Sequence, residues 1–147
     1  MKLQIFYDNT PYRFRGWRKV KTLVNEIIKS AGKITGVISF IITSDGYLRN
    51  LNNQFLNHDY FTDVISFNYN SENNIAGEIY ISEDTVRRNS LDYNVDLNNE
   101  MLRVMIHGVL HLVGYDDKTD TEAKEMRRLE DKWITMLQNN YNCSQSN

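Results

Sequence analysis

The 147-residue sequence has little cysteine, little proline and no long apolar run. Cys143 is its only cysteine, so no intrachain disulfide can form, which suits a reducing compartment. Pro11 is its only proline, and neither a low-complexity linker nor a repeat divides the chain, so one domain over residues 1–147 is expected. No stretch approaches the roughly 20 apolar residues of a membrane-spanning helix. Asp8 comes too early for the apolar stretch of a signal peptide. The sequence therefore predicts a cytoplasmic protein without a membrane partner.

The net charge of −2 does not by itself indicate a nucleic-acid partner, but the charges are unevenly distributed. Residues 1–33 hold eight Lys or Arg against two acidic residues, whereas residues 34–147 hold nine against seventeen. In residues 12–21, YRFRGWRKVK, positive charges alternate with aromatic rings, a pattern that can neutralise phosphates and stack bases. The same pattern fits a solvated basic helix face whose Trp17 packs into the core. From these residues alone, we favour the second, structural interpretation.

Hydrophobic spacing predicts four strands and five helices in the order βαβαββααα. The strands are expected near residues 3–7, 37–43, 64–69 and 76–81, and the helices near 17–31, after Ser44, after Ser82, up to Val113 and after Thr119. The polar residues 70–74 join the last two strands as a hairpin loop. This order indicates an α/β (α+β) fold, with a small mixed four-stranded sheet covered by about five helices.

Several elements carry their own start and stop signals. Ser82, followed by two acidic residues, can cap a helix, and the pattern T-x-x-E that begins at Thr119 is a capping box. Gly114 ends a helix that begins near Asp96 or Asn98 and is apolar almost all round in its second half, so we expect that helix to be buried.

Three packing expectations follow from the apolar residues. The strand over residues 37–43 is expected to be buried on both faces. The helix after Ser44 is expected to pack through Leu48, Leu51 and Phe55. The last helix is expected to present one stripe formed by Met126, Leu129, Trp133 and Met136.

The residues that carry chemistry are concentrated in residues 107–117, HGVLHLVGYDD. His107 and His111 are four apart on a helix, so their imidazoles project from one face. Imidazole is the commonest metal ligand in proteins. Gly114 permits the turn that can bring back a third ligand, Asp117 or its neighbour Asp116. Three His and carboxylate ligands with a fourth position for water are typical of catalytic zinc.

The spacing resembles the metzincin protease pattern H-E-x-x-H-x-x-G-x-x-H. This chain has Gly108 where those proteases have the glutamate that acts as general base. The sequence therefore argues against peptide hydrolysis by that route.

Residues 107–117 resemble the signature of the YbeY endoribonucleases, H-G-x-L-H-L-x-G-Y-D-H, at every fixed position except the last. A second stretch of this family, close to L-N-x-x-Y/F-R-x-x-D-x-P-T-D-V-L-S-F, is similar to residues 51–67, and GEIYI at residues 77–81 resembles the family strand G-D/E-I-x-I. The first 50 residues carry no matching motif. The resemblance therefore extends from Leu51 to Asp117.

The resemblance implies a single-strand-directed, metal-dependent endoribonuclease of ribosomal RNA processing, including maturation of the 3′ end of 16S ribosomal RNA, and of ribosome biogenesis. It implies RNA and the ribosome as partners, not DNA. It assigns one ion to His107, His111 and Asp117, zinc first, with Mn²⁺ or Ni²⁺ as candidates. The ion would activate water or polarise the scissile phosphate. Attack by water and attack by the RNA 2′-hydroxyl both remain open.

Two departures from the family pattern affect this interpretation. Asp117 stands where the family has histidine, and carboxylate is a harder ligand that favours ions such as Mn²⁺. Leu56 stands where the family usually has an arginine that is suited to hold phosphate, and Phe61 replaces a proline. The candidate replacements for that arginine are Arg49, Arg87, Arg88, Arg103 and the basic segment 13–21.

The sequence also suggests the surroundings of three further polar residues. Asp63 is expected to cap or turn the chain ahead of a strand, and His58 to be exposed. Asp116 is expected either to accept a hydrogen bond from a ligating histidine or to be solvated. Two other function classes remain open: a metallohydrolase for another substrate, and a ribosome-assembly binding protein with a structural metal.

Overall fold

The computed structural model describes residues 2–56 and 63–145, and that part of the chain has the predicted order βαβαββααα. Its strands are β1 (Lys2–Tyr7), β2 (Ile34–Thr43), β3 (Val64–Asn68) and β4 (Asn74–Ser82). Its helices are α1 (Trp17–Ser30), α2 (Asp45–Leu56), α3 (Glu83–Asp92), α4 (Leu97–Val113) and α5 (Asp120–Gln145). Among the described residues, no helix combines the length and apolar character that crossing a bilayer requires.

The four strands form one mixed sheet in the order β1-β2-β4-β3. β1 pairs with β2 and β2 with β4 in parallel, whereas β3 pairs with β4 as an antiparallel hairpin. The predicted mixed four-stranded sheet is therefore confirmed. β1 and β3 are the edge strands, and β3 is the edge nearest to the C-terminal half of α4.

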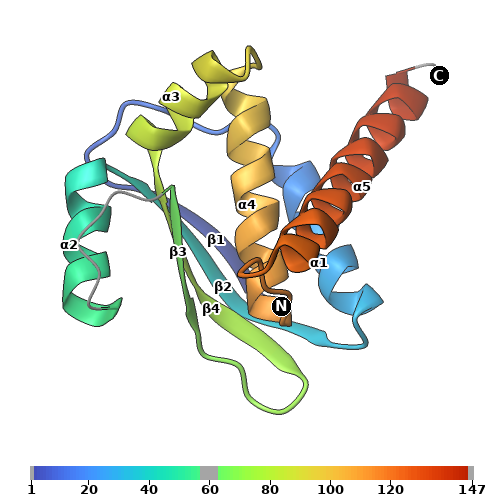
Figure 1. Ribbon diagram of the computed structural model, residues 1–147. Coiled ribbons are helices and arrows are strands. Elements are labelled where there is room, and N and C mark those ends of the chain that lie inside the picture. The colour runs from blue at the N-terminus through green and yellow to red at the C-terminus, as the bar shows by residue number, and fades with distance from the viewer. Residues whose placement is uncertain (1, 57–62, 146–147) are drawn as a thin grey trace.

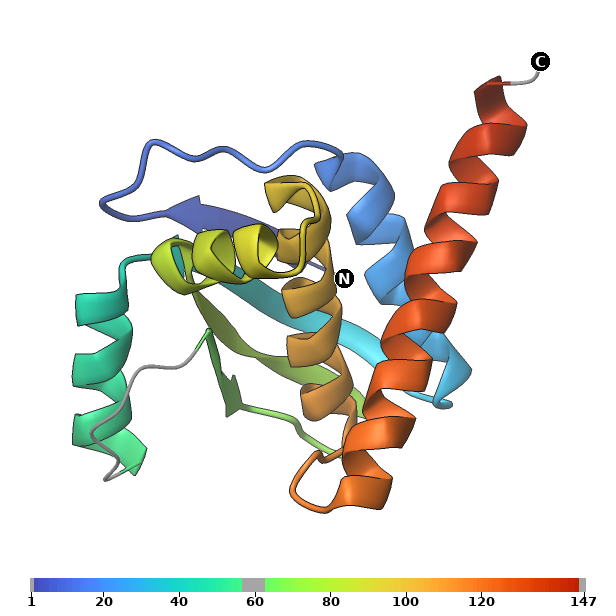
Figure 2. The same ribbon diagram turned by 45° about the horizontal axis from the view of Figure 1, so that its top comes forward.

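The helices divide unequally between the two faces of the sheet (Figures 1 and 2). α1 and α4 lie on one face with α5 packed over them, and the large core cluster fills the space between these helices and the sheet. α2 alone covers part of the other face, where Leu48, Leu51 and Ile65 form a smaller cluster. α4 is therefore the central helix, in contact with the sheet, α1, α3 and α5.

The predicted caps hold the ends of three helices. Ser82 Oγ accepts the backbone N–H of Thr85 at the start of α3 (3.2 Å). The Asp96 carboxylate accepts the N–H of Asn98 at the start of α4 (3.0 Å). At α5, Thr119 and Glu122 exchange the two hydrogen bonds of a capping box.

Three packing predictions need correction. β2 is not buried on both faces, because Ile38, Phe40 and Ile42 face the core whereas Val37 is 52% exposed. This occurs because, in the part of the chain that the structure describes, α2 is the one helix on the second face. Phe55 is 64% exposed, and its ring makes an edge contact with that of Phe67. The buried stripe of α5 ends before Met136, which is exposed because the C-terminal part of α5 extends beyond the core (Figure 2).

Gly108 allows the close approach of α4 to β4. A Cβ atom built at this position would lie 2.7 Å from Cγ2 of Ile79, a fully buried residue. Such a contact is closer than van der Waals packing permits, so any side chain here would push α4 away from the sheet. The same contact leaves no room for the carboxylate that a metalloprotease carries at this position.

We expect Gly108→Ala to lower the free energy of unfolding by about 1–2 kcal/mol, because overpacking outweighs the roughly 1 kcal/mol gained in helix propensity. Chemical denaturation measures the change. Gly46→Ala in α2 is the matched control, since nothing lies within 4 Å of a Cβ there, and it should be neutral or stabilising. Equal effects at both positions would contradict the close packing of α4 on β4.

Candidate metal centre

The two predicted histidines project together from the C-terminal half of α4. One helical turn separates His107 and His111, and their Nε2 atoms lie 3.0 Å apart. α4 then ends at Gly114, which has φ +121°, a conformation that residues with a Cβ rarely adopt. The N–H of Gly114 and of Tyr115 both bond to the carbonyl of Leu110, which closes the turn.

This turn brings the Asp117 carboxylate back to the two imidazoles. Its oxygens lie 3.4 Å from His107 Nε2 and 3.6 Å from His111 Nε2. The three side chains each offer one ligand atom within 4.8 Å of the others, so the cluster could hold a metal ion.

The spacing of the three ligand atoms fits a small divalent cation. Ligands about 2.0–2.1 Å from a tetrahedral ion lie about 3.3 Å from one another. Here the two Nε2 atoms lie 3.0 Å apart, and the Asp117 carboxylate approaches His107 through Oδ2 (3.4 Å) and His111 through Oδ1 (3.6 Å). Lone pairs of two imidazoles and a carboxylate that face one point repel each other unless a proton or a cation lies between them. The donor set therefore suits a cation such as zinc.

Glu130 of α5 completes the arrangement, and the sequence interpretation missed it. Its Oε2 lies 2.7 Å from His107 Nδ1, and its Oε1 accepts a hydrogen bond from Arg103 (3.0 Å). Because an ionised carboxylate can only accept, Nδ1 of neutral His107 carries the hydrogen and Nε2 keeps its lone pair for a metal. One sequence signal could have revealed Glu130: it is an acidic residue four positions after Met126, on the apolar stripe of the last helix, and a buried acid needs a partner.

The environment of His107 raises the pKa of this histidine above its usual value of 6.5. Burial lowers the pKa, but the hydrogen bond to Glu130 and the negative charges of Glu130, Asp117 and Asp63 together outweigh it. A more basic imidazole is a stronger metal ligand, provided that the pH is high enough to deprotonate it.

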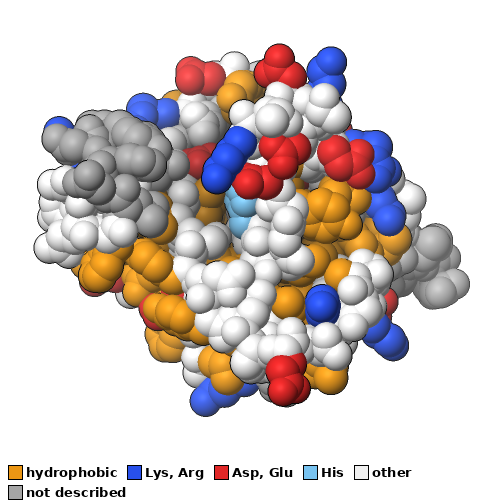
Figure 3. Space-filling view, turned by 60° about the horizontal axis from the view of Figure 1, so that its bottom comes forward, with side chains coloured by type: hydrophobic (Ala, Val, Ile, Leu, Met, Phe, Trp, Pro, Cys, Tyr) orange, Lys and Arg blue, Asp and Glu red, His pale blue; other side chains and the backbone are white. Residues whose placement is uncertain are grey.

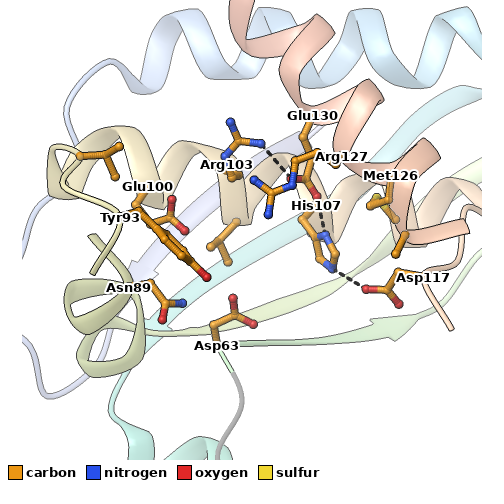
Figure 4. A pocket seen from close by; sticks show the side chains of 13 residues that line it. Asp63, Asn89, Tyr93, Glu100, Arg103, His107, Asp117, Met126, Arg127 and Glu130 are labelled. Carbon is orange, nitrogen blue, oxygen red and sulfur yellow. Dashed lines mark hydrogen bonds and ion pairs between the residues drawn. The ribbon is translucent and has the colours of Figure 1, made fainter. Parts of the chain in front are cut away.

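Two of the three side chains, His107 and Asp117, line one end of a pocket of about 350 Å³ between α3, α4 and α5 (Figures 3 and 4). Figure 3 shows histidine at the bottom of a hollow bordered by acidic and basic side chains. Four carboxylates and two guanidinium groups line the pocket: Asp63, Glu100, Asp117, Glu130, Arg103 and Arg127. With neutral histidine, the pocket carries a formal charge of −2, which one divalent cation would neutralise.

The role of Asp63 extends beyond the predicted cap or turn ahead of a strand. Its backbone carbonyl accepts the N–H of Ser82 (2.9 Å) and so continues the β3–β4 ladder. Its side chain faces the pocket opposite His107 (Figure 4). Burial raises the pKa of Asp63, and this effect outweighs the opposing influence of His107.

The candidate replacements for the family arginine are mostly engaged elsewhere. Arg87 pairs with Glu83, and Arg88 pairs with Asp45, so both serve the packing of α2 and α3. Arg49 is an exposed residue of α2. Arg103 does line the pocket, but its guanidinium is bound to Glu130 and Asp131. Arg127, which the sequence interpretation did not consider, also lines the pocket.

The basic segment 12–21 lies away from this pocket. Trp17 is half-buried with its ring edge-on to Phe40, and Arg15 pairs with Asp96 at the opposite end of α4. The structural interpretation of this segment therefore agrees with its position. Within residues 2–56 and 63–145, no hydrogen bond or ion pair joins Asp116 to a histidine; its carboxylate accepts the backbone N–H of Asp117 and lies 3.9 Å from Lys118 Nζ. His58 and Phe61 are outside the described residues.

Comparisons with known proteins extend over nearly the whole chain. The family model described as Endoribonuclease YbeY matches residues 9–138. A protein named Endoribonuclease YbeY from Flavobacterium psychrophilum is 46% identical over 114 residues, covering 78% of this chain and 81% of that protein. A protein of the same name from Chlorobium phaeobacteroides is 35% identical over 137 residues, covering 93% and 98%. The solution structure of TM1509 from Thermotoga maritima has a TM-score of 0.63 at 29% identity and covers 97% of this chain and 93% of that one.

We expect Glu130→Gln to weaken zinc binding about 10- to 100-fold, because the amide cannot supply the negative charge that makes His107 basic. Titration with zinc against a competing chelator measures the affinity. In the metal-free protein, NMR titration should show the pKa of His107 falling relative to wild type, since burial then acts with less opposition. Asp131→Asn is the matched control, because Asp131 also binds Arg103 but does not contact His107. Equal zinc affinities in wild type and Glu130→Gln would contradict this role.

Proposed function

The chain belongs to the Endoribonuclease YbeY family, and on that premise we propose that it is a metal-dependent, single-strand-directed endoribonuclease. Its substrate is ribosomal RNA, in the maturation of the 3′ end of 16S ribosomal RNA and in ribosome biogenesis, with the ribosome as partner in the cytoplasm. One observation carries the proposal: two imidazoles and a carboxylate converge, and two of these three side chains line an open pocket, in a chain whose relatives are named endoribonucleases.

His107, His111 and Asp117 are the proposed ligands of one divalent ion. Zinc fits two imidazoles and a carboxylate at these separations, and the harder carboxylate keeps Mn²⁺ and Ni²⁺ as candidates. When bound, such an ion polarises a phosphoryl oxygen and lowers the pKa of a water molecule.

The residues around the ligands have separate tasks in this proposal. Glu130 keeps His107 in the tautomer whose Nε2 can bind metal, and Arg103 holds Glu130 in place. Asp117 supplies one negative charge, so the ligand set keeps a net charge of +1 with a divalent ion. That remaining positive charge favours an anionic substrate such as a phosphodiester.

The shape of the pocket supports a single-stranded substrate. Its volume of about 350 Å³ is near the lower end of the range of ligand sites, roughly 300–1,000 Å³. Tyr93 and Val95 line its mouth and are 61% and 44% exposed, so an unstacked base has an aromatic ring and an apolar side chain to pack against. A base inside a duplex could not make these contacts.

The exposure of the ligands favours a catalytic ion over a structural one. The side chains of His111 and Asp117 are 27% and 39% exposed, and the cluster opens into the pocket. A structural zinc site is closed by four protein ligands, whereas the described residues supply three.

Saturating zinc, at about 1,000 times its dissociation constant, should stabilise the protein by about 4 kcal/mol if the ion binds only the folded chain. His111→Ala should remove most of this gain, because it deletes one of three ligands. Thermal unfolding with and without zinc measures both. Identical zinc-dependent shifts in wild type and His111→Ala would contradict the ligand assignment.

Wild-type protein loaded with zinc or Mn²⁺ should cleave single-stranded RNA, and chelation should abolish the cleavage. We expect His107→Ala to lower the rate at least 100-fold, because loss of the ion removes the stabilisation of the developing charge. Gel analysis of a ribosomal RNA fragment measures the rate. Activity on other phosphoesters alone would instead support a different metallohydrolase. Tight RNA binding without any cleavage would support the alternative of a ribosome-assembly binding protein with a structural metal.

The end groups of the products separate the two open routes. Attack by the 2′-hydroxyl leaves a 2′,3′-cyclic phosphate. It cannot occur when the ribonucleotide at the cleavage site is replaced by its 2′-deoxy counterpart. Attack by water tolerates that replacement.

A further inference from the structure

Arg127 is a cation of the pocket whose charge acts on Glu100, where it partly offsets the rise in pKa that burial causes. It lies on α5 one turn before Glu130, and its guanidinium extends over the pocket between Glu100 and His107 (Figure 4). No hydrogen bond or ion pair joins it to any residue of 2–56 or 63–145. Arg103, the other guanidinium of the pocket, is held by Glu130 and Asp131.

The contrast with Arg128 shows that this is not a general property of the helix. Arg128 is the next residue of α5, is not among the residues that line the pocket and forms two hydrogen bonds with Glu125 (2.8 and 2.6 Å). Arg128 is thus paired with an acidic residue of the same helix. The Arg127 guanidinium is instead available to a ligand.

The charge of the pocket explains why a second cation is useful there. The four carboxylates lining it would repel the phosphates of RNA, and one divalent ion together with the two arginines only neutralises them. Arg103 is already bound to carboxylates, so the remaining positive group that can contact a phosphate is Arg127. A guanidinium presents paired N–H donors that match two phosphate oxygens.

We infer that Arg127 binds a backbone phosphate of the RNA next to the phosphate held at the metal centre. This inference rests on the proposed function and adds a substrate-binding residue to the same site. Arg127 belongs to none of the motifs by which the chain resembles its family, and Leu56 stands where the family pattern has arginine. The phosphate-binding cation of this chain therefore comes from α5.

The test compares Arg127→Ala and Arg127→Lys with Arg128→Ala, all loaded with zinc. Stopped-flow fluorescence anisotropy with a labelled single-stranded oligoribonucleotide records binding before cleavage, and initial rates give kcat and KM. We expect Arg127→Ala to raise both Kd and KM about 10-fold or more with kcat changed far less, because a charge-assisted contact present before and during the reaction is lost. Arg127→Lys should recover part of the affinity. Arg128→Ala should stay within about 2-fold of wild type.

Two further measurements separate phosphate binding from a structural role. The slope of log Kd against log salt concentration should fall by about 0.7 in Arg127→Ala, the value for one phosphate contact on single-stranded nucleic acid. Zinc affinity should stay the same or increase slightly, since a positive charge near the ion is removed. A merely structural effect would leave the salt slope unchanged.

The outcomes distinguish this inference from the proposed function. Equal Kd values for Arg127→Ala and Arg128→Ala, with a wild type that binds and cleaves RNA, overturn the inference alone. Loss of zinc affinity in Arg127→Ala, or a fall in kcat with Kd unchanged, also overturns it. A wild type that binds RNA through Arg127 but never cleaves it overturns the proposed activity and supports the inference. A wild type that does not bind RNA overturns both.

Discussion

The contact between His107 Nδ1 and Glu130 Oε2, 2.7 Å long, is the interaction on which the rest of the site depends. It fixes which nitrogen of His107 faces Asp117, and it joins α4 to α5 across the wall of the pocket. Glu130 is only 6% exposed, so its charge would be costly without the two groups that bind it, His107 and Arg103. Docking of α5 and orientation of the candidate metal ligand His107 are therefore one event rather than two.

Much of the fold and part of the site could be predicted because the signals are local. Caps at Ser82 and Thr119, the helical spacing of His107 and His111, and the glycine turn at Gly114 each depend on residues within about one helical turn. The order of strands and helices also follows from local periodicity, and the structure has the same order. The turn after His111 limited the third ligand to Asp116 or Asp117, and the match to the family signature selected Asp117.

The remaining features depend on contacts that no local pattern encodes. Glu130 lies 23 residues from His107, and its role appears only when α5 crosses α4. Val37 was expected inside because its strand is apolar, but apolar composition does not say how many helices cover a sheet. Gly108 looked like a missing catalytic residue, whereas its position against Ile79 shows that packing excludes any side chain there. Arg127 stands out from Arg128 only once their surroundings are known.

All three candidate ligands lie within residues 107–117, so the loop that must close to bring them together is short. Closing a short loop costs little chain entropy. An unfolded chain can therefore gather the same three ligands around an ion and keep part of its affinity, which reduces the net effect of metal on folding. The folded protein differs by supplying Glu130 from a distant helix. Under the proposed ligand assignment, metal affinity would therefore measure whether α5 is docked, more than whether the ligands themselves are assembled.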